Sequence, residues 1–356
     1  MQAAFYNPDI TYEKNYEIGP PLLRTELKSP SFPKSQNFKF LDFAVSLPFG
    51  IPPGPLLNSK FMQAAFDWGF AVSTYKTVRS ASFPCHPFPN VLPVNAGTDL
   101  NPEVTPQLVA QKSYGDNPQE INITNSFGVP SQKPEIWQED VRKALSYVRD
   151  DQLMILSFMG TVRPSQSKDE FVKDFVKTAK LAQETGAKVL EVNLSCPNIG
   201  NEGLVCFNLA ATEEICREIR KNIRSTPLVL KVGYYAKDSD LIKLTEIASK
   251  YAQAIAAINT LQAEVVNKDG TQALPGPNRL KSGICGASIK WAGISMVERL
   301  NKIRKEKAYT FEIIGIGGVM NPQDFQQYRD KGADVVQSAT GAMWNPYLAE
   351  EIAKTI

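Results

Sequence analysis

Strand-like apolar runs recur along this chain, and this repetition limits the folds it can adopt more than any other feature. The runs are centred near residues 45, 73, 156, 191, 230, 257, 314 and 335, and helix-like segments follow them, least clearly after the first. Parallel strands need helical crossovers, and closing eight of them into a ring removes the exposed sheet edges. The pattern therefore predicts an α/β fold, a (β/α)8 TIM barrel, with an open doubly wound sheet as the alternative.

Two long connections interrupt the alternation. The first follows strand 2, from Thr77 to about Asp150, and the second follows strand 6, from Thr260 to Ala287. Connections of this length inside a compact fold are usually functional or disordered, and the patterned look of the first favours function. Residues 1–40 are rich in proline and aromatic residues with little periodicity. We interpret them as an extended N-terminal arm, and residues 41–356 as a single barrel domain.

Helix starts carry explicit signals in three places. Asn58 or Ser59 can cap the helix after the first strand, and Ser167 to Glu170 is a capping box. Asn321 precedes a proline, which favours the first position of a helix. These signals place helix starts after the first, third and seventh strands.

Charge and cysteine content exclude several classes of function. The 39 basic and 37 acidic residues give a net charge of +2, which offers no electrostatic footprint for nucleic acid or an acidic membrane. The 5 cysteines have irregular spacing, which indicates reduced thiols in a cytoplasmic setting, and the single histidine leaves no metal-site spacing. No apolar run approaches the roughly 20 residues that span a bilayer. We expect a soluble protein that binds small molecules or a second copy of itself.

Polar and glycine residues gather where the predicted strands end. They are Lys76, residues 193–198, Lys231, Asn259, Thr260, residues 315–318 and residues 338–341. In a barrel these carboxyl ends converge on one mouth. Glycine turns after strands seven and eight commonly hold a phosphate, although each alone is more often a simple turn. A lysine that closes an apolar strand needs an anionic or electron-rich partner, which a flavin with its phosphate would supply.

The run from Val189 to Asn198 places a thiol between two carboxamides. An apolar strand ends at Asn193, and Cys196 and Asn198 follow within five residues. A thiol has a reference pKa of about 8.5, so Cys196 can exchange a proton near neutrality, and asparagine offers both donors and an acceptor. This set suits a neutral, hydrogen-bonding heterocycle.

The sequence from residue 193 to 198, Asn-Leu-Ser-Cys-Pro-Asn, resembles the dihydroorotate dehydrogenases, in particular their soluble, cysteine-using class. Asn125-Ser126-Phe127-Gly128 upstream and Asn259-Thr260-Leu261 downstream extend the resemblance, which covers about residues 40 to 350. It implies an FMN-containing barrel that oxidises dihydroorotate to orotate in pyrimidine biosynthesis. The chain departs from the family at Pro52-Pro53, where a small Ala-Ser step is usual.

The resemblance also implies roles for individual residues. Cys196 would remove the C5 proton of the substrate while the C6 hydride passes to flavin N5. The implied substrate-binding residues are Asn125, Phe127, Gly128, Val129, Asn193, Asn198, Asn259 and Thr260. Those implied to contact FMN are Lys76, Asn193, Lys231, Ile258, Gly286, Gly317, Gly318, Ala339 and Thr340. A homodimer is expected, and the electron acceptor stays open between fumarate, a quinone, and NAD reached through an electron-transfer partner subunit.

Two alternatives remain open at this point. One is a related flavin oxidoreductase that acts on another dihydropyrimidine. In that group the reactive cysteine lies in the loop after the third strand, and here that loop, residues 158–161, contains no cysteine. The other alternative is a barrel that binds flavin or a pyrimidine but has lost redox function.

Overall fold

Eight parallel strands form one ring at the centre of the protein. The computed structural model describes residues 3–24, 26–32, 38–97, 99–101, 104, 107–195 and 204–356. The strands are β3 (Phe49–Gly50), β4 (Val72–Val78), β7 (Leu153–Phe158), β8 (Val189–Asn193), β9 (Leu228–Val232), β10 (Ala254–Ala257), β13 (Glu312–Ile316) and β14 (Val335–Gln337), in the order β3-β14-β13-β10-β9-β8-β7-β4. The ring closes beside β3, where the Thr74 N–H donates to the Ile51 carbonyl at 2.8 Å. The predicted (β/α)8 barrel is confirmed.

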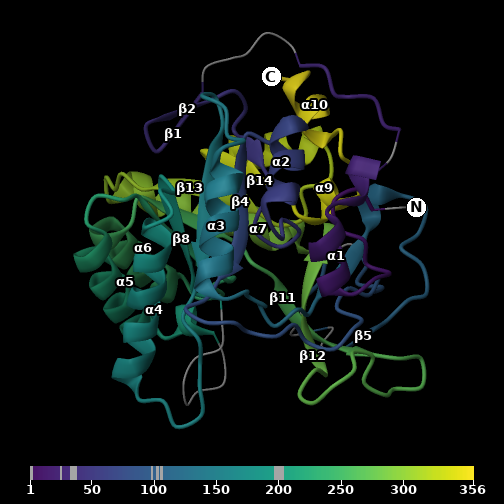
Figure 1. Cartoon of the computed structure of the whole chain (residues 1–356), viewed down its shortest axis with the longest axis horizontal. Helices are drawn as coiled ribbons and strands as arrows, with labels where there is room; N and C mark the ends of the chain where they lie inside the picture. Colours follow the sequence, from purple (N-terminus) through teal and green to yellow (C-terminus); the bar gives the residue numbers. More distant parts are fainter. Residues whose placement is uncertain are drawn as a thin grey trace.

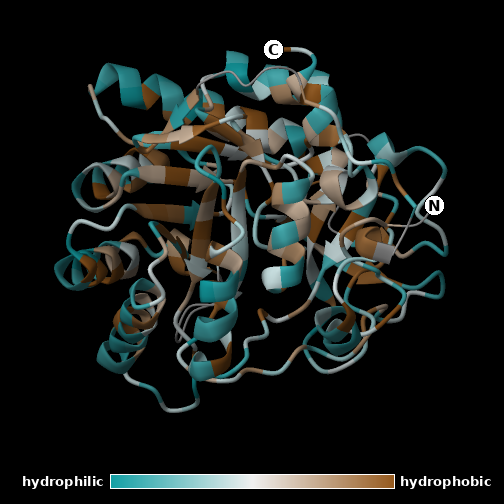
Figure 2. Ribbon diagram, turned by 45° about the horizontal axis from the view of Figure 1, so that its top comes forward, coloured by the Kyte–Doolittle hydropathy of each residue, from teal (hydrophilic) through white to brown (hydrophobic). Residues whose placement is uncertain are grey.

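Helices surround this ring, as Figure 1 shows for α4, α5 and α6 on one side. They are α2 (Ser59–Asp67), α3 (Pro134–Leu145), α4 (Lys168–Gln183), α5 (Leu209–Ile223), α6 (Asp238–Tyr251), α7 (Lys290–Glu306), α8 (Pro322–Asp330), α9 (Thr340–Trp344) and α10 (Leu348–Ala353). The strands between them are mostly hydrophobic, whereas the outer faces of the helices are hydrophilic (Figure 2). Within the described residues, no helix combines the length and apolar character needed to cross a membrane.

The helix starts follow the sequence signals. The Asn58 Oδ1 accepts a hydrogen bond from the Lys60 N–H at 3.1 Å and caps α2. Ser167 and Glu170 form the predicted capping box of α4. The Asn321 Oδ1 accepts from the Asp324 N–H at 2.9 Å and caps α8. All three predicted starts are therefore confirmed.

The two insertions come together in a second sheet at one end of the barrel (Figure 1). Its strands are β5 (Gln107–Val109), β6 (Asn122–Asn125), β11 (Leu261–Val266) and β12 (Lys281–Gly286), in the order β5-β11-β12-β6. β6 from the first insertion pairs with β12 from the second, so that Asn125 lies opposite Gly283. The insertions were predicted, but their union in one sheet was not.

The prediction of a first barrel strand near residue 45 was wrong. That stretch forms an antiparallel hairpin of β1 (Phe38–Phe40) and β2 (Phe43–Val45), and the barrel strand β3 begins at Phe49. Both residues of the hairpin turn have positive φ, 50° at Leu41 and 66° at Asp42. Such turns usually carry Asn-Gly or Asp-Gly, so the sequence lacked the signal for this hairpin. The side chains of Phe40 and Val45 pack against strand residues such as Val72 and Leu153.

The first residues of the chain are not extended throughout. They contain α1 (Tyr12–Ile18) and a 3-10 turn, η1 (Pro21–Arg24). Phe5, Tyr6 and Tyr12 are buried in the core, and the rings of Tyr6 and Tyr12 meet the Phe127 ring edge-on at 5.3 and 6.0 Å. A helix of 7 residues is too short to show a periodic pattern, which is why the sequence did not reveal it. The division into an arm and a barrel domain stays a prediction.

Candidate active site

A cleft opens at the carboxyl ends of the barrel strands, between the barrel and the second sheet. The predicted site residues that line it are Lys76, Asn125, Phe127, Gly128, Val129, Asn193, Lys231, Asn259, Thr260, Gly286, Gly317, Gly318, Ala339 and Thr340. Ile258 lies behind this lining, fully buried, with its Cγ1 3.3 Å from where a Cβ on Gly317 would be. Cys196 and Asn198 fall outside the described residues. The topology brings segments from across the chain to one cavity, and the roles of these residues stay predictions.

Lys76 is one of two buried lysines on the cleft. Its Nζ donates to the Gly54 carbonyl at 2.9 Å and lies 4.9 Å from the centre of the Phe127 ring. Burial lowers the pKa of Lys76 from 10.5 to about 8, and the Cys85 thiol acts in the other direction. An anion bound in the cleft would favour the charged form of this lysine and raise its pKa again.

We predict a pH dependence of stability that depends on Lys76. Between about pH 8 and 10.5 the unfolded chain keeps a proton that the folded chain has lost, so this group makes the free energy of unfolding rise with pH in that window. Lys76→Met should remove this part of the rise in protein stripped of bound ligands. Urea unfolding at several pH values measures it, and parallel profiles for the two proteins would contradict the assignment.

Lys231 is the second buried lysine, and Glu191 is its neighbour in the barrel. The two residues lie on adjacent paired strands, β9 and β8, and each is two positions from a valine, Val229 or Val189, that faces the barrel interior, so both side chains are on that same face. Burial lowers the pKa of Lys231, and Glu191 and the Cys285 thiol oppose this effect. Burial likewise raises the pKa of Glu191, and Lys231 and Ser157 oppose it. Each group favours the charged form of the other, so a cation can persist at the floor of the cleft.

The barrel and the second sheet both contribute carboxamide groups to the lining of the cleft, and Thr260 contributes a hydroxyl group. The Asn193 Oδ1 accepts from the Ser195 N–H at 3.0 Å, which fixes this carboxamide at the end of β8. Asn259 follows β10, and Asn125 ends β6. A Cβ on Gly283 would lie 2.4 Å from the Thr260 Oγ1, so only glycine lets β12 approach this hydroxyl so closely. The set can hydrogen-bond both donors and acceptors of a planar heterocycle.

Glycine turns form the far side of the cleft, after β13 and β14. Gly317 and Gly318 have φ values of 125° and 65°, which side chains rarely adopt. The Thr340 hydroxyl is buried and has no hydrogen-bond partner among the described residues. A buried polar atom of this kind normally has a partner, and a phosphate oxygen would supply one. The turns, the orphan hydroxyl and the buried lysines therefore fit a flavin mononucleotide.

Several lining residues were missed by the sequence reasoning. They are Pro52, Pro53, Gly54, Thr77, His86, Leu204, Gln262, Lys281, Ile289 and Met320, among others. Pro52 and Pro53 were noticed only as a departure from the family, and the cleft shows that they form part of its wall. Gln262 and Lys281 belong to the second sheet, whose position over the barrel no local sequence signal reveals.

The fold and the cleft together define a (β/α)8-barrel enzyme that binds small polar ligands at the strand ends. The chain belongs to the dihydroorotate dehydrogenase family, whose members are oxidoreductases: the family model for dihydroorotate dehydrogenase matches residues 104–356. A dihydroorotate dehydrogenase from Dictyostelium discoideum is 36% identical over 97% of this chain and 95% of its own length. The resemblance seen in the sequence is confirmed.

More distant relatives match about half of the chain. The catalytic subunit of dihydroorotate dehydrogenase B (NAD(+)) from Geobacter sp. (strain M21) is 30% identical over 49% of this chain and 55% of its own length. The corresponding subunit from Staphylococcus carnosus is 28% identical over 51% of this chain and 56% of its own length. The chain is therefore also similar to catalytic subunits of the NAD(+) class, at lower identity and over a shorter stretch.

Proposed function

We propose that this enzyme oxidises dihydroorotate to orotate in pyrimidine biosynthesis, using FMN bound in the cleft. Family membership supports the reaction. The observation that carries the assignment of the site is the meeting of Asn125, Asn193 and Asn259 with the buried Lys231 in one cavity. Carboxamides match the amide edges of a dihydropyrimidine, and a cation matches an anionic or electron-rich partner.

Each part of the cleft has a distinct task in this proposal. FMN, when bound, supplies the acceptor for the hydride from C6. Asn125, Asn193, Asn198, Asn259 and Thr260 hold the pyrimidine, with the backbone of residues 127–129. Cys196, next in sequence to the cleft residue Ser195, removes the C5 proton as general base.

The cofactor contacts divide between the barrel floor and the far wall of the cleft. Lys76 and Lys231 contact the flavin from the barrel, with Asn193 beside them and Ile258 packed behind. Gly286, Gly317, Gly318, Ala339 and Thr340 line its ribityl chain and phosphate. The Thr340 hydroxyl, buried and without a partner among the described residues, supports this side of the proposal.

The location, oligomeric state, binding partners and electron acceptor of the enzyme are also proposals. We propose a cytoplasmic homodimer that binds dihydroorotate and orotate and neither nucleic acid nor membrane. The candidate electron acceptors are fumarate at the same cleft, a quinone, and NAD reached through a partner subunit. The matches to catalytic subunits of the NAD(+) class keep a partner subunit among the candidates.

Anaerobic reduction tests the proposal directly. The purified yellow protein is mixed with dihydroorotate or with dihydrouracil, and the flavin absorbance is followed. We expect bleaching by dihydroorotate alone. Bleaching only by dihydrouracil would indicate a different dihydropyrimidine oxidoreductase, and a flavin that stays oxidised with both would indicate a binding protein. Fumarate, NAD or a quinone, added separately to the reduced protein, then identifies the electron acceptor.

A further inference from the structure

The loop from Ser126 to Val129 lines the cleft and carries an unusual backbone. Gly128 and Val129 both have positive φ, 74° and 55°. A β-branched residue rarely adopts such a conformation, and where it does the surroundings must hold it there. Gly128 cannot be replaced without cost, because a Cβ there would lie 2.5 Å from the His86 Nε2. Something outside the loop must therefore fix its shape.

Two buried arginines hold this loop through its carbonyl groups. The Arg79 Nε donates to the Val129 carbonyl at 2.8 Å, and its Nη2 donates to the Gly128 carbonyl at 3.1 Å. The Arg279 Nη2 donates to the Ser126 carbonyl at 3.0 Å. Arg79 and Arg279 are 4% and 3% exposed, and neither lines the cleft that the loop itself lines. The arginines thus bind the loop on the side that does not line the cleft.

The held carbonyls fix the directions of the neighbouring amide groups. In a planar trans peptide the N–H points opposite to the C=O of the same unit. Anchoring the Ser126 and Gly128 carbonyls therefore turns the N–H groups of Phe127 and Val129 away from the arginines. Within the described part of the chain, neither N–H donates a hydrogen bond to another residue. Free N–H groups in such a turn form a site that suits an anion.

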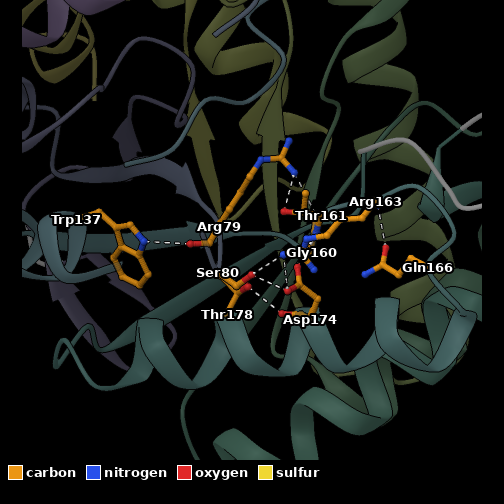
Figure 3. A network of polar contacts seen from close by, with 9 residues as sticks. All are labelled: Arg79, Ser80, Trp137, Gly160, Thr161, Arg163, Gln166, Asp174 and Thr178. Carbon is orange, nitrogen blue, oxygen red and sulfur yellow. Dashed lines mark hydrogen bonds and ion pairs between the residues drawn. The ribbon is translucent and has the colours of Figure 1, made fainter. Parts of the chain in front are cut away.

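Arg79 is itself anchored to the barrel, as Figure 3 shows. Its Nη1 donates to the Thr161 Oγ1 at 3.1 Å, and its carbonyl accepts from the Trp137 Nε1 at 3.1 Å. The Thr161 N–H donates to the Asp174 Oδ2 of α4 at 2.8 Å. The guanidinium also lies 4.0 Å from the centre of the Phe83 ring. The position of the loop is therefore tied to the rigid wall of the barrel.

We propose that Arg79, together with Arg279, is a positioning residue that presents the amide groups of Phe127 and Val129 to the carboxylate of the substrate. This rests on the proposed function, because dihydroorotate and orotate both carry that carboxylate. Arg79 does not contact the ligand in this proposal. It acts through the Gly128 and Val129 carbonyls, which a lysine cannot hold together because its single Nζ lacks the planar fork of guanidinium.

Arg79→Lys tests the proposal in the flavin-loaded protein. Orotate is titrated while the flavin spectrum is recorded, and we expect the dissociation constant to rise about tenfold to a hundredfold, because hydrogen bonds to charged groups depend on amide placement. The KM for dihydroorotate should rise similarly while kcat changes less than about threefold, since the carboxylate is bound alike in the ground and transition states. Amide hydrogen exchange in residues 126–131 should become faster.

Arg163→Lys is the matched control. Arg163 belongs to the same network through the Asp174 Oδ1 at 3.2 Å (Figure 3), and its hydrogen bonds within the described part of the chain go to Ser80, Gln166 and Asp174 and not to the loop. Its variant should bind orotate like the parent protein. Equal orotate affinity in Arg79→Lys and the parent protein would overturn the proposal, as would a loss of kcat alone. Failure of the parent protein itself to bind orotate would instead contradict the proposed function.

A milder variant covers the case in which Arg79→Lys does not fold. Thr161→Val removes the hydroxyl that accepts from the Arg79 Nη1 and leaves the arginine in place. We expect a rise of about twofold to fivefold in the orotate dissociation constant, because one neutral acceptor is lost from the anchor. An unchanged constant in this variant contradicts the positioning role.

Discussion

Replacing Cys196 by alanine is expected to leave a yellow protein whose flavin dihydroorotate reduces about 10²- to 10⁴-fold more slowly, the range for loss of a general base. The C5 proton of the substrate must leave while the C6 hydride departs, and a methyl group cannot accept it. Flavin content and orotate affinity should be close to those of the parent protein. Anaerobic stopped-flow absorbance measures the reduction rate.

A second thiol provides the control for this substitution. Cys216 is fully buried in α5, away from the cleft, and burial holds the pKa of its thiol high, at about 12. Cys216→Ala should reduce its flavin at the parent rate. In the parent protein the rate should rise with pH, because the thiolate and not the thiol accepts the C5 proton. An unchanged rate of flavin reduction in Cys196→Ala would contradict the role of Cys196 as general base.

Lys231→Met should have the second largest effect, a fall in flavin reduction of about 10²- to 10³-fold, comparable to losing one preorganised donor to developing charge. The lysine is buried at the end of β9 and lines the cleft, so its charge acts at low dielectric. The same stopped-flow experiment measures the rate. Flavin content, read from the absorbance of the purified protein, separates weaker cofactor binding from slower reduction.

Glu191 allows the chemistry to be separated from stability. Without Lys231 its buried carboxyl group loses the neighbouring cation that opposes the rise of its pKa, so Lys231→Met should also destabilise the barrel. Lys231→Met/Glu191→Gln should recover stability against urea without recovering the reduction rate. Recovery of both together would show that the single variant was slow only because it was poorly folded.

The barrel and most of the cleft were predictable because parallel strands and their ends leave local signals. Lys76, Lys231 and Asn259 each close an apolar run, and a barrel brings all such ends together. The hairpin at residues 38–45 was missed because Leu41 and Asp42 adopt positive φ without the usual turn residues. The prediction therefore failed at a turn whose residues carry no sequence signal for a hairpin.

Other parts of the site could not be found from one sequence. Arg79 follows Lys76 by three residues and reads as an ordinary surface arginine, since its acceptors are carbonyl groups about fifty residues away. Gln262 and Lys281 reach the cleft only because two insertions pair with each other. A hydrogen bond to a backbone atom far away in the sequence does not depend on which amino acid carries that atom. The sequence therefore contains no pattern that reveals it.

The contact of Tyr6 and Tyr12 with Phe127 has a practical consequence for work with this enzyme. Their rings form the support behind the loop that we assign to the substrate. Trimming the first dozen residues to aid expression would therefore change ligand affinity, and the defect could be mistaken for a fault in the barrel.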